Sequence, residues 1–111
     1  MIGKLARQPV QAAFTGHHAY ARLGQPLAVY GHIHVPFVRS VSGMTVVNSG
    51  SVSLSHDGDS RAAYLIVDDW RPHIRRVDYD VQREIKALHD RRYPHAVWIV
   101  KMLETALPQM A

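Results

Sequence analysis

Two histidines placed two positions apart are the most chemically suggestive feature of the sequence. His32 and His34 lie in the segment YGHIHVPF, directly after an apolar run and a glycine. In an extended segment, residues i and i+2 point to the same side, about 6.5–7 Å apart along the strand. This spacing is awkward for two ligands of one ion, but it suits one histidine on each of two neighbouring ions. From spacing alone, a metal role and a polar loop pair both remain open.

The segment before the histidines determines where they would lie in a fold. Residues 27–30 form a short, continuous apolar run between Pro26 and Gly31, which predicts a strand buried on both faces in the middle of an α/β sheet. Gly31 lets the backbone leave the strand sharply, and Pro36 stops the sheet ladder after the pair. We therefore expect the histidines at the carboxyl end of a central strand, where ligands bind in open α/β sheets.

Further strands and helices are predicted on both sides of this segment. Apolar spacing over residues 9–23 predicts a helix that precedes it. The segments FVRSV and MTVVN flank Ser42 and Gly43, which is the signal of a hairpin with a two-residue turn. The segments AAYLIVDD and HIRRVDY predict two more strands, joined by a turn at DWRP. The sequence therefore predicts about five strands.

The last third of the chain is predicted to be helical. Asp80 is a suitable N-cap for a helix that places Val81, Ile85 and Leu88 on one face. Pro94 is expected to open a last helix, whose wide apolar face suits packing on a sheet or on a neighbouring chain. The fold class is therefore α/β, with about five strands and three helices in layers.

Composition limits the classes of function. A chain of 111 residues with 47% apolar residues can form one small domain with a core. The absence of cysteine excludes disulfides, thiolate metal sites and a cysteine nucleophile. No stretch approaches the roughly 20 apolar residues of a membrane span, so a cytoplasmic protein is expected. Most of the net charge of +4 lies in residues 71–92, but it does not form the dense, aromatic-interleaved patch that nucleic-acid binding needs. A mildly basic surface would still attract anionic substrates such as phosphate esters.

A longer stretch around the histidines carries a family resemblance. LAVYGHIHVPFVRSVSGMTVVNSGSVSLSHDGDSRAAYLIVD resembles the C-terminal part of the calcineurin-like metallophosphoesterases, in particular their small bacterial branch. The shared pattern is an apolar strand, G-H-[TI]-H-x-P, a hairpin, V-N-P-G-S and D-G-D-x-R-A-x-Y, in one register from residue 27 to 68. The resemblance extends over about residues 9–107. It implies the C-terminal half of a layered α/β-β/α sandwich and the hydrolysis of phosphomonoester or phosphodiester bonds at a two-metal centre.

The resemblance also implies roles for individual residues. His34 would bind the first metal ion and His32 the second, the ions being divalent Mn, Fe, Zn or Ni. A supporting role near the ions would fall to four residues, Gly31, Asn48, Gly50 and Ser51. Ser49 stands where the family usually has proline, and the loss of that fixed φ loosens the turn. No catalytic residue is implied.

Several motifs of the family are missing from the sequence. Its two-metal centre also needs a D-x-H, a G-D-x-x-D whose first aspartate bridges the ions, and a G-N-H. Residues 1–31 contain none of them and no Asp, Glu or Asn at all. We therefore expect residues 1–111 to be a single partial domain, the C-terminal half only. His32 and His34 would form one side of a metal site whose carboxylate side is not in this chain, and the chain alone would have little or no activity.

Three alternatives remain open. The chain is also compatible with an inactive remnant that acts as an interaction or oligomerisation module, such as a homo-oligomer formed through the unpartnered first strand or the last helix. Two imidazoles could also hold a single zinc or nickel ion. The segment HDGD at residues 56–59 suggests a calcium loop, but it lacks the further spaced oxygens of one, which favours a turn.

Overall fold

The computed structural model describes residues 24–110, which form five strands and two helices. The predicted α/β class is confirmed. The helix predicted at residues 9–23 lies outside the described residues, so two of the three predicted helices are observed.

The first sheet has three strands, β1 (Leu27–Tyr30), β2 (Phe37–Val41) and β3 (Met44–Asn48), in the order β1-β3-β2. β1 runs parallel to β3, and β2 runs antiparallel to it. The predicted hairpin of β2 and β3 is confirmed. Ser42 and Gly43 have φ values of 49° and 79°, the positive values that a type I′ hairpin turn requires.

The prediction that the first strand lies in the middle of the sheet was wrong for the part of the chain that the structure describes. Within that part, β1 pairs only with β3, and Val29 of β1 is 48% exposed. The central strand is β3, in which Val46 and Val47 are fully buried. A continuous apolar run signals burial, but it does not say which of two apolar strands lies between the others.

The second sheet is a hairpin of β4 (Ala62–Asp68) and β5 (Arg71–Val77). Both strands were predicted, but the turn between them is shorter than the predicted DWRP. It consists of Asp69 and Trp70, both with positive φ, whereas Pro72 lies in β5 opposite Val67. Because hydrogen-bonded and non-bonded pairs alternate along an antiparallel ladder, a proline next to the pair that closes the turn removes no ladder bond.

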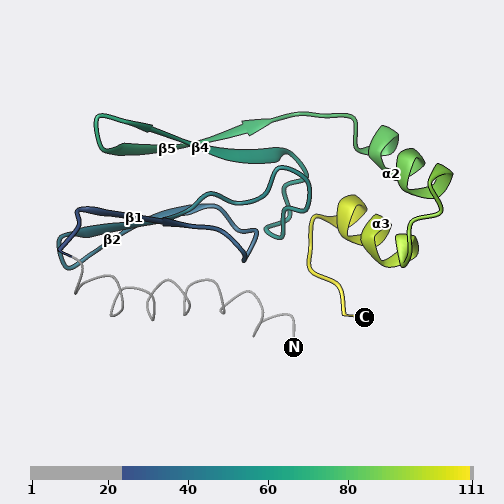
Figure 1. Cartoon of the computed structure of the whole chain (residues 1–111), viewed down its shortest axis with the longest axis horizontal. Coiled ribbons are helices and arrows are strands. Elements are labelled where there is room, and N and C mark those ends of the chain that lie inside the picture. The colour runs from purple at the N-terminus through teal and green to yellow at the C-terminus, as the bar shows by residue number, and fades with distance from the viewer. Residues whose placement is uncertain (1–23, 111) are drawn as a thin grey trace.

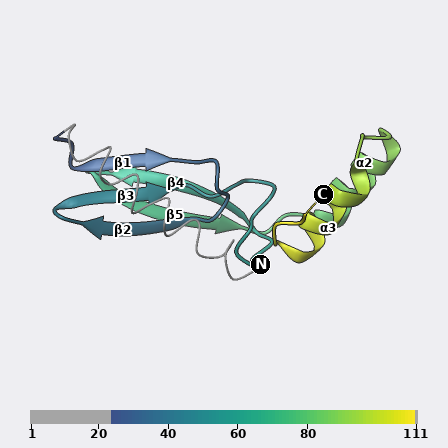
Figure 2. The same cartoon turned by 90° about the horizontal axis from the view of Figure 1, so that it is seen from below.

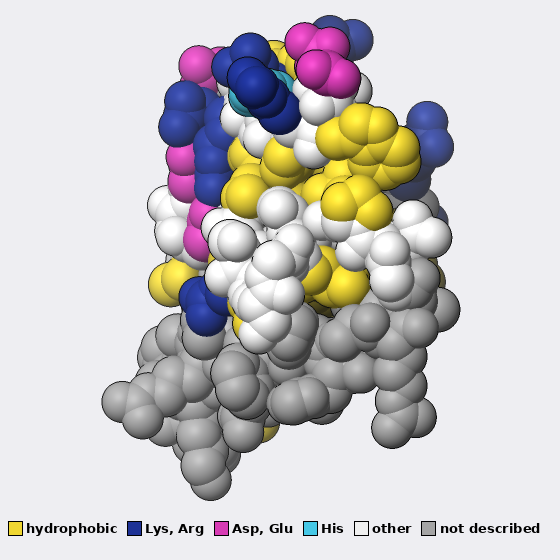
Figure 3. Space-filling view, turned by 90° about the vertical axis from the view of Figure 1, so that its left-hand side faces the viewer, with side chains coloured by type: hydrophobic (Ala, Val, Ile, Leu, Met, Phe, Trp, Pro, Cys, Tyr) yellow, Lys and Arg dark blue, Asp and Glu magenta, His cyan; other side chains and the backbone are white. Residues whose placement is uncertain are grey.

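The two sheets form two layers. The hairpin β4–β5 lies over one face of the sheet β1-β3-β2 in Figure 1, and the two sheets overlap in the perpendicular view of Figure 2. The buried side chains of Met44 and Ala63 belong to opposite layers. At the end of the layers that carries the strand turns, apolar side chains are exposed among charged ones, as Figure 3 shows.

The two helices lie beyond the other end of the sheets and do not cover a sheet face (Figure 2). α2 (Val81–Asp90) begins as predicted, because the Asp80 side chain accepts a hydrogen bond from the Arg83 N–H at 3.0 Å. α3 (Ala96–Thr105) begins two residues after the predicted Pro94. It packs against α2, and neither of these two helices is long and apolar enough to cross a membrane.

Candidate metal centre

The loops after β1 and β3 meet because the two strands run in parallel. Residues 31–36 follow the carboxyl end of β1 and residues 49–61 follow that of β3. Both loops lie at the end of the sheets that faces α3 (Figure 1). The first loop carries His32 and His34, so the fold places both histidines at the carboxyl end of a strand.

Asn48 joins the two loops. Its side chain is fully buried, its Nδ2 donates to the Gly31 carbonyl at 2.8 Å, and its Oδ1 accepts from the Gly50 N–H at 2.9 Å. The backbone adds a bond from the Ser49 N–H to the Tyr30 carbonyl at 3.1 Å. The Gly31 carbonyl needs a donor and the Gly50 N–H needs an acceptor, and an amide side chain supplies both.

Gly50 allows the loops to approach closely. Its φ is +76°, and a Cβ added to it would lie 2.9 Å from the Ala63 Cβ and 3.0 Å from the Pro36 Cβ. A residue with a side chain would therefore face both an unfavourable backbone conformation and a collision. Gly50 brings the histidine loop, the loop after β3 and β4 together at one point.

Ser51 shapes the next turn. Its Oγ accepts hydrogen bonds from the N–H of Ser53 at 3.3 Å and of Leu54 at 3.0 Å, and its carbonyl accepts from the Ala63 N–H at 2.8 Å. The hydroxyl turns the chain back on itself, and the carbonyl fixes this turn to β4. As a result, the Leu54 carbonyl lies beside the histidine loop.

His34 is oriented by that carbonyl. The distance from its Nδ1 to the Leu54 oxygen is 2.9 Å. A carbonyl oxygen can only accept, so Nδ1 carries the proton, and in the neutral ring Nε2 keeps its lone pair. A backbone carbonyl on the far nitrogen is the usual partner of a histidine that binds a metal ion through the other one. The residue therefore fits one ligand position of a divalent ion.

His32 differs from His34. It is exposed, has φ +76°, and its ring forms no hydrogen bond with the residues that the structure describes. Over residues 24–110, no group of three or more histidine, aspartate or glutamate side chains is placed to hold an ion together. The assignment of His32 and His34 to separate ions therefore stays a prediction.

His56 is a third imidazole at this site, and the sequence analysis missed it. Its ring centre lies 4.8 Å from that of His34, with 36° between the planes. Burial lowers the pKa of His56 below the ordinary histidine value and His34 lowers it further, while Asp57 opposes the shift. His56 is therefore mainly neutral at pH 7, the form that can bind a metal ion.

The acidic residues of the same loop are engaged with arginines. Arg76 forms an ion pair with Asp57, and Arg61 donates from Nη2 to Asp59 at 2.7 Å. Hydrogen bonds from Arg61 hold the pKa of Asp59 well below its usual range. These carboxylates face guanidinium groups and not a common point where a calcium ion could bind, which is compatible with the interpretation of HDGD as a turn.

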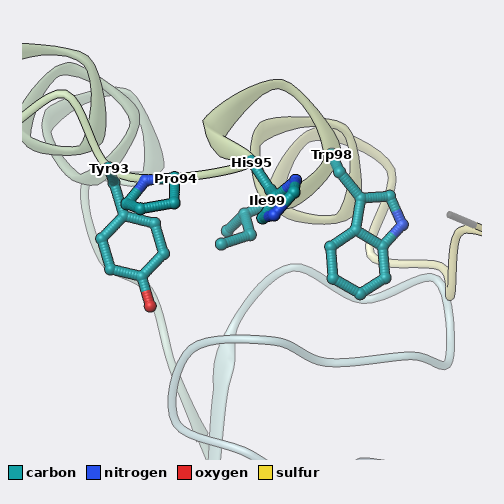
Figure 4. A pocket seen from close by; sticks show the side chains of 5 residues that line it. All are labelled: Tyr93, Pro94, His95, Trp98 and Ile99. Carbon is teal, nitrogen blue, oxygen red and sulfur yellow. The ribbon is translucent and has the colours of Figure 1, made fainter.

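A separate hollow of about 310 Å³ lies where the two helices join. It is lined by five residues, Tyr93, Pro94, His95, Trp98 and Ile99, which Figure 4 shows in close view. None of them belongs to the loops that carry the histidines. The hollow is therefore a feature of the helical end of the molecule and not part of the candidate metal centre.

Comparison with known proteins identifies similar chains. The sequence profile described as the calcineurin-like phosphoesterase superfamily domain matches residues 5–69. An uncharacterised protein of Methanocaldococcus jannaschii is 31% identical, over 69% of this chain and 38% of its own length. The crystal structure of a metallophosphoesterase from Sphaerobacter thermophilus superposes with a TM-score of 0.63 and 26% identity, over 75% of this chain and 44% of that one.

A hypothetical protein of Pyrococcus horikoshii has the same fold, with a TM-score of 0.66, 15% identity, and coverage of 80% of this chain and 35% of that one. The chain thus spans less than half the length of these relatives. The profile match begins at residue 5, so the expectation that only the C-terminal half of the family domain is present is not borne out. That expectation came from the resemblance of residues 27–68 to the C-terminal part of the family and from the motifs missing in residues 1–31, and neither shows where a match to the domain begins.

Proposed function

The chain belongs to the calcineurin-like phosphoesterase superfamily, and on this basis we propose that it bears the histidine side of a metal-dependent phosphoesterase centre. The reaction would be the hydrolysis of phosphomonoester or phosphodiester bonds. When bound, divalent ions polarise the phosphoryl oxygens and make the attacking water more acidic.

The observation that carries the proposal is the hydrogen bond between His34 Nδ1 and the Leu54 carbonyl. It fixes the tautomer of the ring, so that Nε2 is the nitrogen whose lone pair is available to an ion. Asn48 and Gly50 hold the loops that make this contact possible. In this proposal His34 binds one ion and His32 binds the second, and the ligands suit Mn, Fe, Zn or Ni.

The proposal also concerns the source of the carboxylate ligands that a two-metal centre needs. Asp57 and Asp59 are engaged by arginines, and residues 1–31 contain no acidic residue. Two adjacent divalent ions need a bridging anionic ligand to offset their mutual repulsion. We therefore propose that this ligand comes from polypeptide other than these 111 residues, and that the chain alone binds metal but turns over little substrate.

Metal binding and turnover by the chain test this proposal together. Calorimetry with Mn²⁺, Zn²⁺ and Ni²⁺ is expected to show heat of binding that His34→Ala abolishes, because the oriented imidazole is lost. Hydrolysis of bis-p-nitrophenyl phosphate and of p-nitrophenyl phosphate is expected to stay near background. The matched control is His73→Ala, which removes an exposed histidine of β5.

Two results would contradict the proposal in different ways. Absence of heat with all three ions would remove the metal centre. Robust hydrolysis of the phosphodiester that His32→Ala and His34→Ala abolish would show that the centre is complete without any further polypeptide.

A second candidate is an interaction module that forms a homodimer through α3. The supporting observation is the apolar surface of this helix, where Val97 is 80% exposed and Trp98, which lines the hollow, is 39% exposed. Single apolar residues on a surface are ordinary, but apolar residues grouped around a hollow are typical of protein contact sites.

Size-exclusion chromatography with light scattering tests this second candidate. A dimer is expected at micromolar concentration, and Val97→Glu is expected to shift it to monomer, because burying an unpaired carboxylate is unfavourable. Val52→Glu, at a residue that is 67% exposed in the loop after β3, is the control that should leave the dimer intact. A monomeric wild-type chain would exclude the dimer.

A further inference from the structure

We propose that His56 is a ligand of the ion that His34 binds, so that the two imidazoles form a site for one borderline divalent cation such as Zn²⁺ or Co²⁺. The inference rests on the proposed function in one respect, the role of His34 as a ligand. It assigns a new site residue, in a segment that sequence reasoning interpreted only as a turn.

The backbone fixes the two residues beside one another. The His56 N–H donates to the His34 carbonyl at 3.0 Å, while the His34 ring donates to the carbonyl of Leu54, two residues before His56. The neighbouring Ser55 is buried, and its hydroxyl donates to the Arg61 carbonyl at 3.0 Å. Hydrogen bonds between the two loops therefore fix His34 and His56 relative to one another, in addition to the contact between their rings.

The separation of the rings suits a shared ion. Imidazole nitrogens bind Zn²⁺ at about 2.0–2.1 Å, and with an angle of about 90–110° at the metal the ring centres come to lie about 4.5–5.2 Å apart. The ring centres of His34 and His56 are 4.8 Å apart. The separation is therefore compatible with one ion between the two rings, once the rings turn about their side-chain bonds.

An unpartnered nitrogen on His56 points to a ligand. Its Nε2 is buried and has no hydrogen-bond partner among residues 24–110. The adjacent carboxylate of Asp57 does not supply one, because it pairs with Arg76. Leaving a buried polar atom unpaired is unfavourable, and such atoms commonly bind an ion or a water molecule.

The ligand type determines the kind of ion. A pair of neutral nitrogen ligands without a carboxylate favours zinc, cobalt, nickel or copper over magnesium or calcium, which prefer oxygen. Water would complete the coordination, so we expect weaker binding than at a four-ligand structural zinc site.

The test uses the whole chain, with Zn²⁺ in calorimetry and Co²⁺ in visible absorption. His56→Phe keeps a ring that can stack on His34 but removes the nitrogen, and it is expected to weaken binding of both ions at least about tenfold. His34→Phe should have the same effect, whereas His73→Ala, which removes an exposed histidine of β5, should change the affinity little. Equal unfolding curves in urea show that the variants are folded.

The outcomes separate this inference from the proposed function. If His56→Phe binds both ions as the wild type does while His34→Phe does not, His56 only packs against a ligand and the inference is wrong. If His34→Phe also binds normally, the proposed metal centre fails as well.

A measurement on the wild-type chain makes the test independent of folding of the variants. Histidine ring ¹⁵N chemical shifts, recorded with and without Zn²⁺, should change at Nε2 of both His34 and His56. A change at His34 alone would overturn the inference.

Discussion

Replacing Gly50 by alanine is expected to lower the free energy of unfolding by about 2–5 kcal/mol. A left-handed backbone costs a residue with a side chain about 1–2 kcal/mol, and overpacking adds about 1–3 kcal/mol. The added Cβ would lie 2.9 Å from the Ala63 Cβ and 3.0 Å from the Pro36 Cβ. Urea denaturation followed by circular dichroism measures the change.

Gly43→Ala is the matched control for this prediction. Gly43 has a similar φ of +79°, but nothing lies within 4 Å of an added Cβ. It should therefore show only the conformational cost, and the difference between the two variants measures the close approach of the loops. Equal losses of stability would mean that the contact at Gly50 is easily relieved, which would contradict the prediction.

Replacing Asn48 by aspartate is expected to destabilise the chain by about 3–5 kcal/mol at pH 7.5, because it places an uncompensated charge in a fully buried position. The carboxylate could still accept from the Gly50 N–H but could not donate to the Gly31 carbonyl, the bond that Asn48 Nδ2 makes at 2.8 Å. A protonated carboxyl could do both. The measurement is urea denaturation at several pH values, compared with the wild type at each.

The sign of the pH dependence follows from burial. Burial raises the pKa of the introduced carboxyl above its unfolded value of about 3.9. The loss of stability relative to wild type should therefore be smallest below pH 4 and should grow as the pH rises through the folded-state pKa. Asn48→Ala removes both hydrogen bonds without adding a charge, so its loss should be independent of pH. A loss for Asn48→Asp that does not vary with pH would contradict the role assigned to Asn48.

Local sequence signals predicted most of the secondary structure. Ser42 and Gly43 marked their hairpin turn, and Asp80 marked the start of α2. The errors concern relations between distant segments. The run before Gly31 showed that β1 is apolar, but the order β1-β3-β2 depends on which strands pair, and that is a tertiary property. The start of α3 was misplaced because His95 takes a left-handed conformation that its residue type does not signal.

For the candidate site too, some residues could be predicted from the sequence and others could not. The His-x-His spacing drew attention to His34, and the family resemblance added Asn48 and Gly50. The structure shows the hydrogen bonds and the close contact that these residues make. Spacing could not identify the Leu54 carbonyl, since any residue supplies a carbonyl. His56 was missed because 22 positions separate it from His34 and no sequence period connects two loops that follow different strands.

The backbone at the histidine pair has a consequence for engineering the chain. His32 and His34 have φ values of 76° and 59°, a region that glycine occupies at lower cost. Directed evolution that selects only for soluble expression would therefore tend to replace these histidines by glycine or asparagine. Such a library would gain yield while discarding the groups proposed to bind metal, so its screen should include metal retention from the first round.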